Sequence, residues 1–181
     1  MQVAQFRSIS EQLPIADKQW YAIRTLLNCE KKVAGFLSEI SVEHYLPLQQ
    51  YTRIYGRRKA NVTKPLIRNY LFVKIIRRDY IKILDTQFVL GFVKFGDQIN
   101  AIPEREIDFI RLIVGEYQDF EVEQSEIAVG EEIEIIGGLL TGLKARMTER
   151  KGRNKVLVEL QSVGVGLLLD VEEKYIRRIV S

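Results

Sequence analysis

The stretch Lys64–Ile75, KPLIRNYLFVKI, decides the fold because it has the composition of a strand at the centre of a sheet. It is rich in β-branched and aromatic residues, and its only proline stands near its start. Side chains of a strand alternate between its two faces. The expected core face holds Ile67, Leu71, Val73 and Ile75. The opposite face holds Arg68, Tyr70, Phe72 and Lys74.

This second face mixes aromatic rings with positive charge, which is unusual for idle surface and for core. One interpretation is a docking surface for a large, partly acidic partner. The other is that a helix of the same chain covers Tyr70 and Phe72. The strand pattern alone leaves both open.

Positive charge is concentrated around this strand. Between His44 and Arg78 there are nine Lys and Arg residues and no Asp or Glu, although the whole chain carries a net charge of only +3. Charge segregated in this way creates a local positive field. It indicates either a solvated basic hairpin or contact with nucleic-acid phosphates that is largely independent of sequence.

The bulk composition is that of an ordinary globular protein. Of 181 residues, 46% are hydrophobic and 28% charged, and no apolar run approaches the length of a membrane span. Residues 1–18 lack the apolar core of a signal peptide, and the single cysteine, Cys29, forms no internal disulfide. We expect a cytoplasmic protein with no membrane partner.

The N-terminal part alternates strand and helix patterns, which predicts an α+β fold with helices packed on an antiparallel sheet. A helix over Cys29–Ile40 would have Asn28 as its N-cap and Glu30 in its first turn. A bent strand over Glu43–Tyr55 would form a hairpin with the central strand. The other expected elements are a strand at Trp20–Thr25, a short helix after Asp79 and a strand at Val89–Phe95. The last is a helix from Pro103 to Val114, with an apolar stripe made by Ile107, Ile110, Ile113 and Val114.

An acidic stretch, EYQDFEVEQSE at Glu116–Glu126, separates this part from a C-terminal series of short strand patterns. The resulting division is a flexible arm at 1–18, a first domain at 19–117, a linker at 118–126 and a small all-β barrel domain at 127–181. The expected strands of the barrel are Glu131–Ile136, Leu143–Glu149, Lys155–Leu160, Gly164–Asp170 and Tyr175–Val180.

The residue types that carry most enzyme chemistry are sparse. There is no Cys/His cluster for zinc and no phosphate-binding GxxxxGK[ST] loop, and a catalytic triad would have to use the only histidine, His44. We therefore expect a binding protein with no catalytic residues, no metal and no cofactor.

Several motifs, taken in order, resemble the NusG family of transcription elongation factors, which join an N-terminal NGN domain to a C-terminal KOW barrel. Trp20-Tyr21 is similar to the family's opening strand, and PLIRNYLFV at Pro65–Val73 to its most recognisable one. GFVKFG at Gly91–Gly96 is followed by Ile102-Pro103, like the family's last strand and helix start. The C-terminal part resembles the KOW motif, with Gly138, Gly142 and Leu143 at its signature positions.

The departures from the family pattern are informative. Many members carry Pro-Gly where this chain has Arg68-Asn69, and Lys144 stands where a second KOW glycine is common. The NYLFV and FVKFG stretches are closer to specialised paralogues of the RfaH and UpxY groups. The His-Thr-Thr-Thr stretch of RfaH, however, has no counterpart around Ile83–Thr86.

The resemblance implies a mechanism. The NGN domain would bind the clamp helices of RNA polymerase and suppress pausing or termination. The family motif implies that the docking residues are Tyr70, Phe72 and Phe92. It also implies Ile67, although strand alternation places this residue on the opposite face. The residues expected to contact DNA or RNA in the elongation complex, or polymerase itself, are Arg57, Arg58, Lys59 and Arg68.

The KOW barrel would recruit a further partner, which in the family is termination factor Rho or a ribosomal small-subunit protein. Three functions remain open: a specialised antiterminator for particular operons such as those for surface polysaccharides, a general elongation factor, and an RNA- or ribosome-binding protein.

Overall fold

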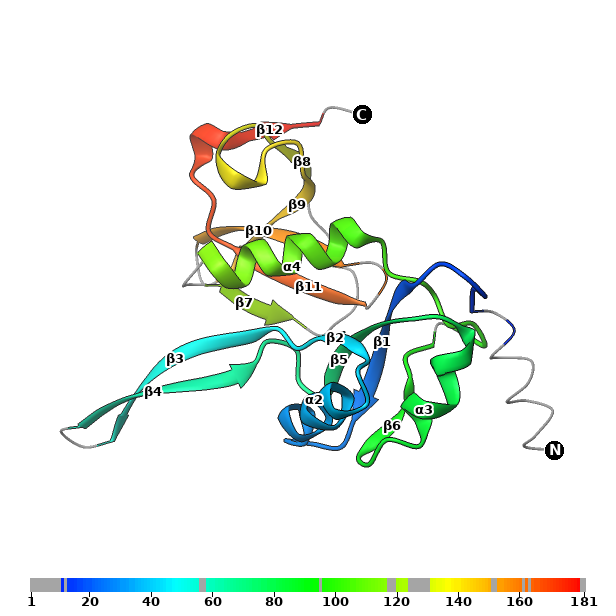
Figure 1. Ribbon diagram of the computed structural model, residues 1–181. Coiled ribbons are helices and arrows are strands. Elements are labelled where there is room, and N and C mark those ends of the chain that lie inside the picture. Colours follow the sequence, from blue (N-terminus) through cyan, green and yellow to red (C-terminus); the bar gives the residue numbers. More distant parts are fainter. Residues whose placement is uncertain are drawn as a thin grey trace. The chain divides into compact units, whose positions relative to one another are not determined.

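The computed structural model describes residues 11, 13–55, 58–94, 96–116, 120–123, 131–150, 153–160, 162 and 164–179 (Figure 1). The chain divides into two compact units, Met1–Val114 and Gly115–Ser181. The first unit combines helices with an antiparallel sheet and the second is β-rich, so the expected α+β fold class with a β-rich C-terminal part is confirmed.

The first unit is built on a four-stranded antiparallel sheet with the strand order β2-β5-β1-β6. The strands are β1 (Gln19–Thr25), β2 (Glu43–Tyr45), β5 (Tyr70–Ile75) and β6 (Val89–Phe92). In the β1–β5 register, Tyr21 lies opposite Val73 and Ala22 lies opposite Phe72. Because directly opposed residues share a face, this register defines the two faces of the sheet.

One face, which we call the α2 face, forms the main core of the unit. Its strand residues Tyr21, Ile23, Leu71 and Val73 belong to one buried cluster with side chains of the helices α2 (Glu30–Glu39) and α3 (Tyr80–Leu84). From α2 come Val33 and Leu37, four residues apart and therefore on one side of the helix. Each such buried side chain contributes roughly 1.5–3 kcal/mol relative to its exposed state.

The other face, the α4 face, carries Trp20 and is joined to α4 (Glu104–Glu116). The indole N–H of Trp20 donates to Glu104 Oε2 at 3.0 Å, and the guanidinium of Arg111 lies 5.5 Å from the Trp20 ring centroid. The apolar stripe of α4, which the sequence predicted, is fully buried at Ile107, Ile110 and Ile113.

The single strand expected over Lys64–Ile75 is two strands in the structure. The chain leaves β4 (Arg58–Pro65), turns through residues 66–69 and enters β5. Pro65, the last residue of β4, has no N–H to donate to a further ladder hydrogen bond, and Asn69 has a left-handed backbone with φ 64°. β4 pairs with β3 (Leu48–Tyr55) as a two-stranded hairpin, which extends away from the four-stranded sheet (Figure 1).

The sequence predicted a flexible arm at residues 1–18, but the described part of this arm packs against the first unit. Leu13 is buried in the core of the first unit. Arg77 binds the same segment, because its side chain donates to the carbonyls of Leu13 and Glu11 and its backbone N–H donates to the carbonyl of Pro14.

The second unit is a six-stranded antiparallel sheet with the order β12-β8-β9-β10-β11-β7. Its first strand, β7 (Phe120–Glu123), pairs with β11 and lies inside the stretch expected to be a linker. All five residues of β11 are buried. The remaining strands are β8 (Glu131–Ile135), β9 (Lys144–Arg150), β10 (Arg153–Leu160), β11 (Val165–Leu169) and β12 (Ile176–Arg178).

Within the described residues, no helix has both the length and the apolar character needed to cross a bilayer.

Candidate docking surface and basic hairpin

Half-buried tyrosines lie on the α4 face next to arginines. Tyr70 opens β5 and lies opposite the exposed Arg24 of β1. Tyr45 of β2 lies beside Arg111, whose guanidinium is 5.3 Å from the Tyr45 ring centroid. We call Arg24, Tyr45, Tyr70 and Arg111 the aromatic-basic patch.

Tyr45 is held firmly within this patch. Its ring stacks on Phe72 at a centroid distance of 6.3 Å and an interplanar angle of 23°. Burial raises the pKa of the Tyr45 hydroxyl to about 12, and the positive charge of Arg111 partly opposes this rise. The hydroxyl therefore stays protonated at neutral pH and can donate a hydrogen bond.

Three of the four predicted docking residues are buried, so the exposure expected for Phe72 and Phe92 is wrong. Phe72 has no exposed surface; it lies opposite Ala22 on one side and Tyr45 on the other. Phe92 lies on the α2 face, because β6 pairs it with Ile23.

The Phe92 ring belongs to the core, where it stacks on Tyr80 at a centroid distance of 5.0 Å. Ile67 is 1% exposed, as expected for the core phase of the pattern. Of the four, only Tyr70 is partly open to solvent. Polymerase binding by any of them stays a prediction.

The turn before Tyr70 is fixed by a buried carboxylate that the sequence did not single out for this role. Glu30 is 3% exposed, and its Oε1 accepts a hydrogen bond of 2.8 Å from the backbone N–H of Asn69. The carbonyl of Asn69 accepts from the backbone N–H of Thr25, also at 2.8 Å. The expected N-cap of α2, Asn28, is displaced: Cys29 occupies the N-cap and Asn28 has φ 58°.

The hairpin is attached to the same helix. Lys31, the neighbour of Glu30, donates from Nζ to the carbonyl of Thr63 in β4 at 2.8 Å. No sequence motif indicates this contact, since both residues belong to common exposed types. Together, Glu30 and Lys31 connect the first turn of α2 to both ends of the segment that leads into β5.

The predicted basic residues are distributed along this hairpin. The register places Arg58 opposite Tyr55 and Lys59 opposite Ile54, whereas Arg57 lies outside the described residues. Arg68 is exposed in the turn after β4. Among the described positions, Arg58 and Lys59 begin β4 and Arg68 follows its other end, so the three positions are spread along the chain of the hairpin.

Lys74, also expected on the open face, is engaged in an ion pair. Its Nζ lies 2.9 Å from Glu104 Oε2 at the start of α4. The hydrogen bond from Lys74, followed by the one from Trp20, lowers the pKa of Glu104, and the same bond to Glu104 raises the pKa of Lys74. Lys74 thus connects β5 to α4.

The KOW-like residues form the turn between β8 and β9 of the second unit. Gly138 and Gly142 have φ 73° and 85°, which L-residues other than glycine rarely adopt. Two hydrogen bonds close the turn. The N–H of Gly142 donates to the carbonyl of Ile135, and the N–H of Ile135 donates to the carbonyl of Leu143. Gly137, which was not singled out, lies against Tyr175: a Cβ there would come within 2.0 Å of that ring.

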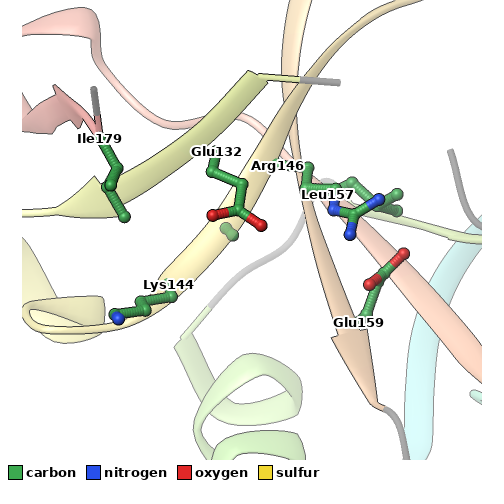
Figure 2. A pocket seen from close by; sticks show the side chains of 7 residues that line it. Glu132, Lys144, Arg146, Leu157, Glu159 and Ile179 are labelled. Atoms are coloured by element: carbon green, nitrogen blue, oxygen red, sulfur yellow. The ribbon is translucent and has the colours of Figure 1, made fainter. Parts of the chain in front are cut away.

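A shallow pocket of about 220 Å³ lies on the second unit (Figure 2). Its lining combines charged side chains of both signs with three apolar side chains. Its lining residues are Glu132, Lys144, Ala145, Arg146, Leu157, Glu159 and Ile179. This mixture provides no preference for one ligand charge.

Metal-ligating side chains do not converge anywhere in the part of the chain that the structure describes, judged by groups of three or more His, Cys, Asp and Glu. His44 uses Nδ1 for a 2.9 Å hydrogen bond with the carbonyl of Val42. Cys29 is a free, partly buried cysteine.

A sheet with helices, extended by a basic hairpin, makes up the first unit, and a small all-β sheet makes up the second. The chain belongs to the NusG family: the family profile described as transcription termination factor nusG matches residues 18–111, more than half of the chain. This confirms the resemblance inferred from the motifs.

Among its relatives are the transcription termination/antitermination proteins NusG of Streptococcus pyogenes serotypes M3 and M1. Each is 28% identical over 170 residues, which cover 86% of this chain and 93% of the relative. A solved structure described as domain interaction in Thermotoga maritima NusG is similar with a TM-score of 0.57 and 21% identity, covering 90% of this chain and 98% of that one. At this identity the structural likeness supports the fold. The chain is therefore a NusG-type transcription termination/antitermination factor.

Proposed function

We propose that the first unit binds the clamp helices of RNA polymerase and that the bound factor suppresses pausing or termination in the cytoplasm. The observation that carries this proposal is the aromatic-basic patch, where half-buried tyrosines lie beside arginines on the face that the family motif identifies. Tyrosine and arginine are among the three residue types most enriched at binding hot spots.

In this proposal Tyr70 contacts polymerase directly, and Phe72 contributes indirectly by supporting a neighbouring ring. A fully buried Phe72 cannot touch a partner, but it supports the Tyr45 ring that stacks on it. Phe92 and Ile67 contribute through the core that shapes the sheet. The exposed Arg24 and Arg68 supply positive charge for an acidic partner surface.

The test measures affinity for core RNA polymerase. Tyr70→Ala is expected to weaken binding by about 2 kcal/mol, roughly 30-fold, as loss of an aromatic hot spot does. Phe72→Ala is unsuitable, since removing a fully buried phenylalanine destabilises the fold itself by about 3–5 kcal/mol.

A matched control is Leu90→Ala, which removes a side chain that is 64% exposed on β6. Its affinity should equal that of the parent. A folded Tyr70→Ala protein that binds polymerase as tightly as the parent would place the docking surface elsewhere.

We further propose a specialised factor that acts on particular operons, as the NYLFV and FVKFG stretches suggest. The competing candidate is a general NusG factor whose second unit binds Rho or a ribosomal small-subunit protein. The length shared with the Streptococcus proteins, 93% of each, favours this second candidate. Run-off transcription on several templates separates them, because a general factor acts on all templates and a specialised one only on those carrying its element.

A further inference from the structure

The solvent-facing side of α2 carries a stripe of residues next to the buried Val33 and Leu37. Residues spaced by three, four and seven positions lie on one side of a helix. At this spacing the solvent-facing side holds the residues that we call the α2 stripe: Lys32, Gly35, Phe36 and Glu39. Phe36 is half-buried, and the other members of the stripe are exposed.

The stability of α2 itself does not account for these residue types. Glycine lowers the stability of a helix interior relative to alanine, yet a Cβ on Gly35 would meet nothing within 4 Å, so no described neighbour requires glycine there. Lys32 lies in the first turn of α2 and Glu39 ends the helix, which is the reverse of the charge order that the helix dipole favours. Among the described residues, neither charge is neutralised by a salt bridge.

An aromatic pair and exposed leucines border the α2 stripe. Phe36 stacks on Phe88 at a centroid distance of 6.2 Å, and Lys32 Nζ lies 5.5 Å from the centroid of the Phe88 ring. Leu26 donates its N–H to the carbonyl of Phe88 at 2.9 Å and is 45% exposed, and Leu27 is 62% exposed. Clustered apolar side chains that stay open to solvent are typical of a surface that binds a protein.

We infer that the α2 stripe binds the α2 stripe of a second copy of this chain, with the two helices antiparallel. The stripe reads Lys, Gly, Phe, Glu from its N-terminal end, so an antiparallel copy presents Glu, Phe, Gly, Lys in the same direction. Each Lys32 then faces Glu39 of the other copy, and each Phe36 faces the open space above Gly35 of the other copy. Such a contact is the same from both sides and closes as a two-fold symmetric dimer.

Charge complementarity favours a second copy as the occupant. Lys32 and Glu39 are about 10 Å apart along the helix, too far to pair within one copy. A partner must therefore bring an acidic group to one end of the stripe and a basic group to the other, with an aromatic or other bulky apolar side chain placed over Gly35. The antiparallel α2 stripe of a second copy supplies all of these groups at the required spacing.

The contact is small and does not involve the aromatic-basic patch. It joins one helix of ten residues from each copy, which is less than the ~1,200–2,000 Å² of a stable interface, so we expect a dissociation constant of about 10–100 µM. The α2 stripe belongs to the helix that packs on the α2 face, whereas the patch lies on the α4 face. The inference therefore goes beyond the proposed polymerase binding and does not depend on it.

The first experiment is sedimentation velocity of the full chain from about 5 to about 500 µM, concentrations that bracket the expected dissociation constant. Gly35→Gln fills the open space and should weaken dimerisation at least about tenfold. At about 5 µM, where the chain is monomeric, the same substitution should raise the Tm by about 2–4 °C, because glutamine favours a helix more than glycine does. Opposite effects on stability and on association separate loss of contact from loss of fold.

Charge reversal provides a second, matched test. Lys32→Glu and Glu39→Lys each place like charges opposite one another and should each weaken dimerisation at least about threefold. The two substitutions combined restore opposite charges and should return the dissociation constant to within about twofold of the parent. Lys94→Glu reverses an exposed charge beyond β6 and should dimerise like the parent.

Two results would overturn the inference. One is a parent chain that sediments as a monomer up to about 500 µM. The other is a dimer that Gly35→Gln and both single charge reversals leave unchanged, since the copies would then meet elsewhere. Gly35→Gln should bind core polymerase as tightly as the parent, so failure of the dimer leaves the proposed function standing and failure of polymerase binding leaves the dimer standing.

Discussion

Asn69 adopts a backbone conformation that few residues tolerate, directly before the strand of the proposed docking surface. Its φ is 64°, and its N–H is held by the buried Glu30. Asparagine and glycine enter the left-handed region readily, whereas other L-residues incur about 1–2 kcal/mol there. Arg68-Asn69, where many family members have Pro-Gly, is thus a second way to make the same turn.

Asn69→Ala is therefore expected to lower the free energy of unfolding by about 1–2 kcal/mol. Asn69→Gly should differ from the parent by less than about 0.5 kcal/mol, since glycine keeps the N–H that binds Glu30 and also removes a buried Oδ1 without a partner. Urea denaturation of the three proteins measures the difference. Equal destabilisation by both substitutions would mean that the side chain matters and the backbone conformation does not.

Glu104 predicts a pH effect because its pKa is lowered in the folded state by Lys74 and Trp20. A lowered folded-state pKa stabilises the protein above the usual value of 4.5, and this stabilisation is lost as the pH falls below it. At neutral pH the Tm of the parent should exceed that of Glu104→Gln. This difference in Tm should therefore shrink in acid.

The fluorescence of Trp20, the only tryptophan of the chain, provides a local measurement of the same event, since its N–H donates to Glu104. Glu39→Gln, which removes an equal charge at the exposed end of α2, controls for net charge. A parent-to-variant difference in Tm that is constant between neutral and acid pH would contradict the pKa shift.

At the scale of elements, the basic hairpin predicts a salt-dependent contribution to nucleic-acid affinity. Arg57→Gln, Arg58→Gln and Lys59→Gln combined should reduce the slope of the logarithm of nucleic-acid affinity against the logarithm of salt concentration, by roughly one for each phosphate that is no longer neutralised. The loss of affinity should be similar for different sequences, because phosphates carry no sequence information. An unchanged slope would show that the far end of the hairpin does not meet phosphates.

The elements of the first unit were largely predictable, but the occupancy of their faces was not. Alternation placed Leu71 and Val73 in the core, and the 3.6-residue period identified the buried stripe of α4. Neither pattern predicts which face of the sheet a helix covers, so Phe72 was predicted to be exposed to solvent. Phe92 was misplaced because only the β1–β6 register, a long-range pairing, assigns it to the α2 face.

The strand β7 was missed for a different reason. Phe120-Glu-Val-Glu123 alternates apolar and acidic residues as a half-buried strand does, but the surrounding acidic composition favoured a linker. The Glu30–Asn69 contact had no sequence signal at all, since a glutamate in the first turn of a helix is common for electrostatic reasons alone.

At the scale of the whole molecule, β7 determines where the chain can be divided. A fragment of residues 117–181 keeps β7 beside β11, whereas a fragment of residues 127–181 exposes the edge of a strand that is buried along its full length. The longer fragment should therefore have the higher Tm, and the shorter one should aggregate more readily. Thermal unfolding and size-exclusion chromatography compare them, and equal Tm values would assign β7 to the linker after all.

The two contacts made by Glu30 and Lys31 give the hairpin a fixed base, independent of what its far end carries. Eight residues of strand form an arm of about 27 Å, so a small change of angle at the base would be magnified severalfold at the end. Anchoring the arm beside a rigid sheet suppresses that swing. Substitutions at the far end of the arm can then change its chemistry while its attachment to α2 stays the same.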